Sequence, residues 1–163
     1  MEFEFDLIVI GAGSGGLAAA KRAANYGAKV AIIEVNQIGG TCVVRGCVPK
    51  KLMVYAANNR RNMISSEGYG LISKEITFNS NILLNKVREE VSRLSNLHSS
   101  SLKKLNVKVF EGLGRFLSQN TIEVVCPKTK KILNKLSSKK ISATNFWVNY
   151  YFYNLPCWYW SRF

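Results

Sequence analysis

Hydrophobic residues in the first part of the chain predict two buried strands separated by a helix. Residues 5–10, "FDLIVI", form a nearly continuous apolar run, which is typical of a parallel strand covered on both faces. Residues 11–27 carry alanines at helical spacing, and Gly27 is the expected C-terminal stop. A second apolar run, "AKVAIIE", ends at Glu34. Strand, glycine turn, helix and strand together predict a right-handed βαβ unit.

Two long helices and a set of short strands are expected in the remainder of the chain. Residues 50–64 and 80–105 carry apolar side chains at helical intervals. The second helix shows one apolar stripe, made of Leu83, Val87, Val91, Leu94 and Leu97. Short apolar segments separated by turns predict a small antiparallel meander from residues 107–112, 114–118, 121–126 and 130–136. The whole pattern predicts an α/β fold with a parallel sheet.

Composition and charge favour a globular domain. The chain has 163 residues, 47% of them hydrophobic, which is enough for one domain with a core. The formal net charge is +13, but the basic residues are dispersed. In the densest run, residues 128–140, apolar residues separate the lysines, as on a strand with one solvated face. Nucleic-acid binding is therefore a weaker alternative, although the positive potential would attract anionic ligands.

Cysteine usage and the N-terminal residues bear on the cellular compartment. The cysteines are too few and too unevenly spaced for the disulfide framework of a small secreted protein. They are Cys42, Cys47, Cys126 and Cys157. The N-terminal residues are acidic where a signal peptide is basic, and their apolar run is short. We therefore expect a cytoplasmic protein without a membrane span, in which a lasting disulfide would have a catalytic role.

The motif "GAGSGG" predicts a dinucleotide-binding turn. Gly11, Gly13 and Gly16 have G-x-G-x-x-G spacing directly after the first strand and at the start of the helix. Glu34 ends the second strand about twenty residues later, where a carboxylate accepts hydrogen bonds from a ribose hydroxyl. An acid there disfavours a 2′-phosphate, so FAD or NAD is expected rather than NADP. A glycine-rich turn without a ligand is the alternative.

The stretch "GGTCVVRGCVPKK", residues 39–51, raises three possibilities for its two cysteines. A zinc site is disfavoured because the only histidine, His98, is far away in sequence, and we expect no metal. Structural, unreactive thiols and a redox pair remain open. On a regular helix, Cα atoms five residues apart are about 8 to 9 Å apart, whereas a disulfide needs less than about 7 Å. A bridge would need a distorted turn, which Gly46 would permit, and Lys50 with the helix start would lower the pKa of the attacking Cys42 thiol.

These motifs resemble the FAD domain of the pyridine nucleotide disulfide oxidoreductases, a family that includes glutathione, trypanothione and mercuric reductases and lipoamide dehydrogenase. "GAGSGG", "IIE" and "GGTCVVRGCVPKK" carry the resemblance, and the last is most similar to the glutathione reductase type of cyanobacteria and plants. It implies a partial, three-layer FAD/NAD(P)-binding domain over residues 1–145, with long helices and a β-meander.

The resemblance also implies roles for individual residues. Cys42 matches the thiol that attacks the disulfide substrate, Cys47 the thiol that contacts the flavin, and Lys50 the lysine near flavin N5. The implied FAD contacts are Gly11, Gly13, Ser14, Gly15, Gly16, Glu34, Thr41, Cys42, Lys50 and Gly114. In the family, NADPH reduces FAD, FAD reduces the disulfide, and the dithiol reduces glutathione disulfide.

Family members are longer homodimers, with a separate NADPH domain and an interface domain that supplies a His/Glu proton relay. Because His98 lies in a predicted helix of the first domain, it cannot replace that relay. We therefore expect no turnover from this chain alone. The alternatives are a non-enzymatic FAD- or NAD-binding module and a reductase for another disulfide, such as trypanothione or thioredoxin. No nucleic-acid or membrane partner is expected.

The composition changes abruptly after Asn145. The segment 146–163, "FWVNYYFYNLPCWYWSRF", holds all three tryptophans and is too short and too interrupted to span a bilayer. It also departs from the family pattern, which continues into a strand and a glycine turn. Our hypothesis is that this segment results from a frameshift or a truncation, and an evolved interaction tail is the alternative.

Overall fold

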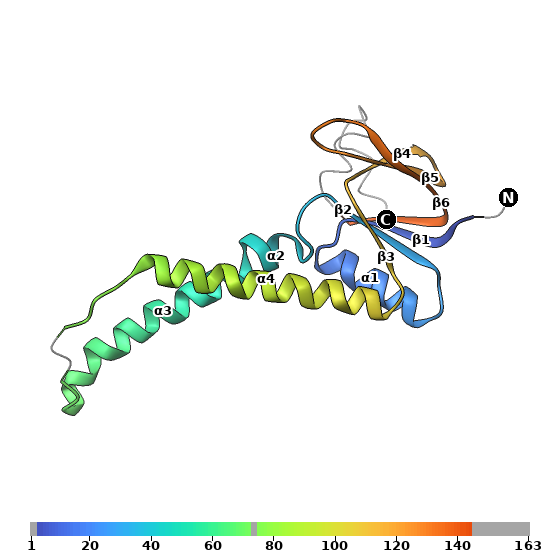
Figure 1. The fold of residues 1–163 in the computed structure, drawn as a ribbon. Coiled ribbons are helices and arrows are strands. Elements are labelled where there is room, and N and C mark those ends of the chain that lie inside the picture. The colour runs from blue at the N-terminus through green and yellow to red at the C-terminus, as the bar shows by residue number, and fades with distance from the viewer. Residues whose placement is uncertain (1–2, 73–74, 145–163) are drawn as a thin grey trace, which may run out of the picture.

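One six-stranded mixed sheet forms the centre of the protein (Figure 1). The computed structural model describes residues 3–72 and 75–144, so the aromatic segment 146–163 and its proposed origin lie outside the described residues. The strand order is β3-β2-β1-β6-β5-β4. Pairs among β3, β2, β1 and β6 are parallel, and pairs among β6, β5 and β4 are antiparallel.

The predicted βαβ unit is present. It consists of β1 (Phe5–Ile10), α1 (Ser14–Asn25) and β2 (Val30–Glu34). The two strands are parallel, with Ile8 opposite Ala31, and every residue of β2 is buried. Gly27 follows the helix with a φ of 84°, a left-handed conformation that turns the chain toward β2.

The meander differs from the prediction in one strand. Residues 107–112 were expected to belong to it, but β3 (Lys108–Glu111) pairs in parallel with β2 at the opposite edge of the sheet. The observed meander is β4 (Leu113–Ser118), β5 (Thr121–Val125) and β6 (Ile132–Ala143). The prediction was wrong because apolar alternation identifies a strand but does not identify the neighbour with which it pairs.

Strand β6 connects the two parts of the sheet. It extends well beyond the predicted 130–136 segment, and its two halves have different partners. Its first half pairs antiparallel with β5, where Leu136 faces Ile122. Its second half pairs in parallel with β1, where Ile141 faces Ile8. The meander is therefore continuous with the parallel part of the sheet.

Two hydrophobic clusters cover the two faces of the parallel strands and establish the three-layer α/β architecture. One cluster joins β1 and β2 to the meander through Ile8, Ile33 and Val124. The other joins the opposite face to α1 and to the end of α4 through Ile32 and Leu102. Because each of these side chains is almost completely buried, truncating one to alanine would cost about 2–5 kcal/mol.

The two predicted long helices form an arm that projects from the sheet (Figure 1). They are α3 (Cys47–Ser65), which is followed by the short 3-10 helix η1 (Ser66–Tyr69), and α4 (Ser80–Lys104). Asn79 caps α4, because its side-chain oxygen accepts hydrogen bonds from the N–H groups of Asn81 and Ile82. Only the last part of α4 packs beneath the sheet.

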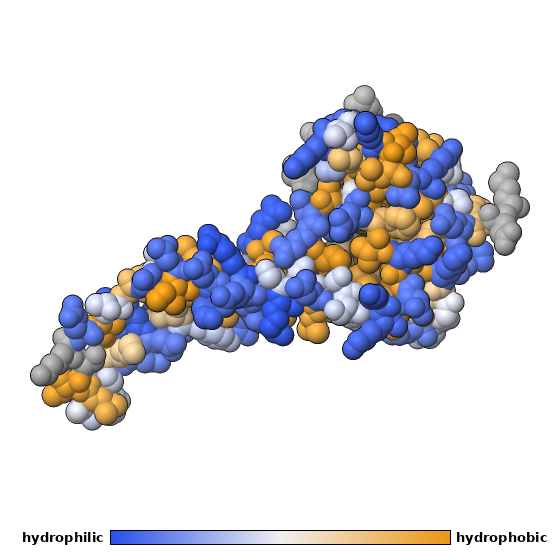
Figure 2. Space-filling view, in the orientation of Figure 1, coloured by the Kyte–Doolittle hydropathy of each residue, from blue (hydrophilic) through white to orange (hydrophobic). Residues whose placement is uncertain are grey.

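The arm leaves much of its apolar surface in solvent. None of the side chains of α3, all of which the structure describes, is fully buried. In α4, Val87 and Val91 of the predicted stripe are buried, but Leu97 is 54% exposed. Figure 2 shows orange patches along the arm and at its tip. Within the described residues, no helix is both long enough and apolar enough to cross a bilayer.

Candidate functional site

The glycine turn between β1 and α1 is closely packed, and two of its glycines are required by geometry. Gly11 has a φ of 98°, and its N–H donates to the Ile33 carbonyl at 2.8 Å, which ties the turn to β2. A side chain on Gly16 would place its Cβ 1.8 Å from the Gly11 carbonyl oxygen, where no atom fits. These are the tight turn and the close helix packing that the motif predicts.

The first turn of α1 is open to an anion. Gly13 is the N-cap and has no side chain with which to accept a hydrogen bond, and the first turn holds no acidic residue. Ser14 and Gly15 are exposed. The free N–H groups and the positive end of the helix dipole therefore face solvent at the site expected for a pyrophosphate.

Glu34 joins the end of β2 to the glycine turn. Its Oε2 accepts a hydrogen bond from the Ala12 N–H at 2.6 Å, and its Oε1 accepts one from the Asn36 N–H at 2.9 Å. The residue is buried, yet each carboxylate oxygen keeps a further lone pair for a ribose hydroxyl. The sequence predicted that Glu34 accepts hydrogen bonds from a ribose. It did not predict that Glu34 also accepts hydrogen bonds from the backbone of the glycine turn.

A pair of adjacent glycines places the cysteine segment against the glycine turn. The Gly39 N–H donates to the Ala12 carbonyl at 2.9 Å. Gly40 has a φ of 64°, and a Cβ on it would lie 2.7 Å from the Cα of Gly13. Sequence reasoning missed both roles, although two glycines directly before a cysteine motif were the available signal. The glycine turn and the helix that begins at Gly40 therefore pack together through backbone atoms, with no side chain between them.

The two cysteines lie on either side of a helix break. Cys42 belongs to α2 (Gly40–Arg45), and Cys47 is the first residue of α3. Gly46 separates the helices, and a Cβ on it would lie 2.8 Å from the Thr41 carbonyl oxygen and 3.3 Å from the Cys42 Cα. The distorted turn expected at Gly46 is therefore present, and it brings the two cysteines together. Both are exposed free thiols in this structure.

The pKa of the Cys42 thiol differs from the expectation. We expected Lys50 and the helix start to lower it, but it is raised, first by a hydrogen bond with Cys47 and second by partial desolvation. The charge of Lys50 lowers the pKa but is outweighed. In the dithiol form, Cys47 therefore favours the protonated state of Cys42.

The four remaining candidate residues lie in β4 (Gly114), in the two cysteine-bearing helices (Thr41 and Lys50) and in α4 (His98). Gly114 is buried in β4, where a Cβ would meet Ile10 Cγ2 at 3.2 Å. The nearby Gly112 N–H donates to the Glu34 carbonyl at 2.8 Å, which brings this part of the chain to the end of β2. Thr41 and Lys50 are exposed on the two cysteine helices. His98 is partly buried in α4, and desolvation, followed by the charge of Lys21, lowers its pKa.

Thr144 is a further residue of the turn that the sequence analysis missed. Its hydroxyl donates to the Ile10 and Gly11 carbonyl oxygens, at 3.0 and 3.1 Å, so that the end of β6 holds the end of β1. Its Oγ1 also lies 2.8 Å from the position of a Cβ on Gly16. No sequence motif marks this contact, because it depends on the pairing of β6 with β1.

Comparisons with known proteins find a family and several relatives with similar sequences. The family model described as pyridine nucleotide-disulphide oxidoreductase matches residues 5–141. Glutathione reductase of Nostoc sp. is 50% identical over 124 residues, and glutathione reductase of Burkholderia cepacia is 41% identical over 123. The chloroplastic/mitochondrial glutathione reductase of Pisum sativum is 37% identical over 134 residues.

The matches cover 76% of this chain but only 27%, 27% and 24% of the three relatives, in that order. The chain thus spans about a quarter of the length of these proteins. The family match extends over the glycine turn, the two cysteines and the meander, which are the parts that the geometry brings together. The chain belongs to the pyridine nucleotide-disulphide oxidoreductase family.

Proposed function

We propose that this chain is the FAD-binding and dithiol-bearing part of a glutathione reductase-type enzyme, which reduces glutathione disulfide with NADPH. The observation that carries the proposal is the contact between Gly13 and Gly40. It fixes the helix of Cys42 against the turn that would hold the cofactor pyrophosphate. A dinucleotide site and a cysteine pair are thereby parts of one packed unit, as electron transfer between them requires.

The residues present fit FAD. The open first turn of α1, with Gly13, Ser14 and Gly15, would receive the pyrophosphate, and Glu34 would accept the ribose hydroxyls. Thr41 and Lys50 would lie along the flavin, and Gly114 near the adenine. FAD, when bound, supplies the two-electron chemistry that links NADPH to the cysteine pair.

The cysteine pair would carry out the exchange with the substrate. The Cys42 thiol loses its proton and attacks one sulfur of glutathione disulfide, which breaks the S–S bond and releases one glutathione thiolate. The Cys47 thiolate then attacks the Cys42 sulfur of the mixed disulfide, which releases the second glutathione. The products are two glutathione thiols and a Cys42–Cys47 disulfide, and the glutathione disulfide is reduced by two electrons.

We propose that NADPH binding, the acid–base group and the homodimer contacts of such an enzyme belong to parts of the longer protein outside the 163 residues, and that the protein works in the cytoplasm. The chain by itself would bind FAD without catalysing turnover. The test is NADPH-dependent reduction of glutathione disulfide by the full-length protein and by its Cys42→Ser variant. Activity that survives Cys42→Ser, or that favours trypanothione or thioredoxin, would overturn the assignment.

A further inference from the structure

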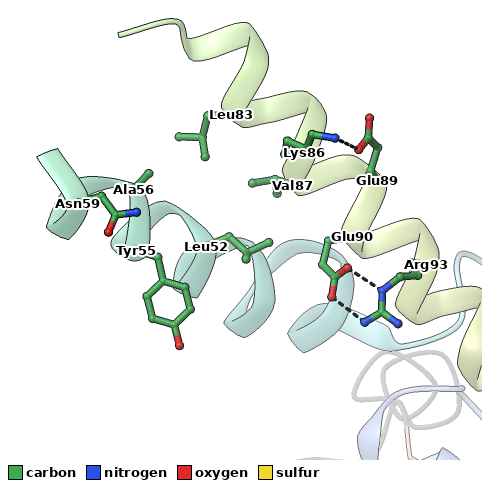
Figure 3. Close-up of a pocket in the computed structure, with 10 residues that line it drawn as sticks. All are labelled: Leu52, Tyr55, Ala56, Asn59, Leu83, Lys86, Val87, Glu89, Glu90 and Arg93. Atoms are coloured by element: carbon green, nitrogen blue, oxygen red, sulfur yellow. Dashed lines mark hydrogen bonds and ion pairs between the residues drawn. The ribbon is translucent and has the colours of Figure 1, made fainter. Parts of the chain in front are cut away.

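Helix α4 borders two grooves with different electrostatics. The first, of about 530 Å³, lies between α3 and α4 (Figure 3). Its charged side chains neutralise one another: Lys86 pairs with Glu89 at 2.8 Å, and Arg93 pairs with Glu90 at 2.7 Å. A groove whose cations are already paired offers little to an anionic ligand.

The second groove, which we call the Arg45–Arg88 groove, has a volume of about 340 Å³ and lies where α2 and the start of α3 meet α4. Its polar side chains are Gln37, Arg45, Arg88 and Ser92, and its apolar floor includes Val44 and Leu84. None of the described residues that line it is acidic. A lining of apolar side chains with a few polar groups is typical of small-molecule sites.

Both guanidinium groups are available to a ligand. Among the residues that the structure describes, Arg88 donates only to the neutral Asn85 side chain, at 3.1 Å. Within the described part of the chain, neither arginine pairs with a carboxylate. The two arginines belong to separate helices and line one groove, so an anion held in it would receive hydrogen bonds from both guanidinium groups.

We propose that the Arg45–Arg88 groove binds a phosphate monoester with a small apolar body. The two cations match the charge of a phosphate monoester, which is about −1.5 to −2 at neutral pH, better than they match a single carboxylate. Each guanidinium can donate two parallel hydrogen bonds to phosphate oxygens. Ser92 and Gln37 supply further donors, and the apolar floor accepts the rest of the ligand.

This site is separate from the proposed FAD site. Its lining includes neither α1 nor residues 11–16, and it includes neither cysteine. Arg45 nevertheless lies between Cys42 and Cys47 in the chain, at the end of α2. A ligand here would therefore contact α2, the short helix that carries Cys42, from the side that faces α4.

The test is a titration of the 15N-labelled 163-residue chain with phenyl phosphate, followed through the arginine Nε–H NMR signals. Arg45→Gln and Arg88→Gln identify their own signals by loss, and both residues are exposed, so neither change disturbs the core. We expect the Arg45 and Arg88 signals to move together with one half-saturation concentration. Either substitution should weaken binding at least about tenfold.

Three controls make the result specific. Arg93→Gln, in the groove between α3 and α4 whose charged side chains pair with one another, should leave the affinity for phenyl phosphate unchanged. Benzoate should bind more weakly than phenyl phosphate, and inorganic phosphate should also bind more weakly because it lacks the apolar body. Equal shifts at every arginine, absence of shifts at Arg45 and Arg88, or benzoate binding as tight as phenyl phosphate would each overturn the proposal.

Discussion

Gly40 and Gly13 meet through their backbones, so closely that a single Cβ on Gly40 would lie 2.7 Å from the Gly13 Cα. The two glycines belong to different motifs, one next to the cysteines and the other in the dinucleotide turn. Their contact means that the two motifs cannot be separated or tilted apart without loss of packing. The relative placement of the glycine turn and of the helix that carries Cys42 is therefore determined by this backbone contact.

Gly40→Ala tests this contact. We expect it to destabilise the fold by roughly 2–4 kcal/mol, from the positive φ of 64° and the clash together, and to abolish FAD binding. Gly27→Ala is the matched control, because Gly27 also has a positive φ but nothing lies within 4 Å of its Cβ position. It should cost only about 1–2 kcal/mol and leave FAD affinity intact. Urea unfolding and flavin fluorescence titration measure both effects, and equal losses in the two variants would contradict the account.

Glu34→Gln removes a buried acceptor from the same region. The Ala12 and Asn36 N–H groups both donate to this carboxylate, and an amide can accept through one oxygen only. We expect a loss of about 1–3 kcal/mol in the free energy of unfolding and weaker FAD binding. Glu111→Gln, at the exposed end of β3, serves as the control and should be neutral. A fully stable Glu34→Gln variant would show that the carboxylate does not organise the turn.

The raised pKa of Cys42 predicts a pH-dependent reactivity. The rate at which iodoacetamide alkylates Cys42 should increase at a higher pH than it does for an ordinary cysteine, because the hydrogen bond with Cys47 favours the neutral thiol. Cys47→Ser, which removes that thiol, should move the Cys42 profile to lower pH. Since the pKa is raised in the folded protein, the associated stabilisation is present below the unfolded pKa and is lost as the pH rises through the folded value.

Cys126 gives an internal reference for this experiment. Hydrogen bonds from Thr129, first from its side chain, lower the pKa of Cys126. Peptide mass mapping of the alkylated protein should therefore show Cys126 reacting at lower pH than Cys42. The reverse order would contradict the assigned environments of the two thiols.

Gly46→Ala tests the helix break between the two cysteines. The added Cβ would lie 2.8 Å from the Thr41 carbonyl oxygen, so α2 and α3 must move apart at their junction. We expect the Cys42–Cys47 disulfide to form less readily, which dithiol redox buffers would show as a higher reduction potential. Gly68→Ala, in η1 with nothing near its Cβ position, should leave the potential unchanged. An unchanged reduction potential in Gly46→Ala would mean that the Cys42–Cys47 disulfide does not need the helix break at Gly46.

The sequence predicted the local elements well and their long-range partners poorly. The βαβ unit, the glycine turn and the two long helices follow from periodicity and glycine spacing, which are local properties. The edge position of β3, the Thr144 hydroxyl at the glycine turn and the Gly40 contact depend on pairings between distant segments. Periodicity carries no information about such pairings.

The thiol chemistry shows the same limit. Lys50 and the helix start suggested a lowered pKa for Cys42, because charge and dipole effects can be estimated from spacing alone. The opposing hydrogen bond with Cys47 depends on the fold of residues 42–47 around Gly46. The raised pKa was therefore accessible only from the structure.

The most direct test of the central claim, that the cysteine pair and the flavin form one redox unit, is the visible absorption spectrum of the FAD-loaded chain during reduction with dithiothreitol. We expect the disulfide to be reduced and a long-wavelength charge-transfer band to appear beside the flavin band, to persist in Cys42→Ser and to be absent in Cys47→Ser. A chain that binds FAD but gives the same spectrum with and without Cys47 would contradict the account.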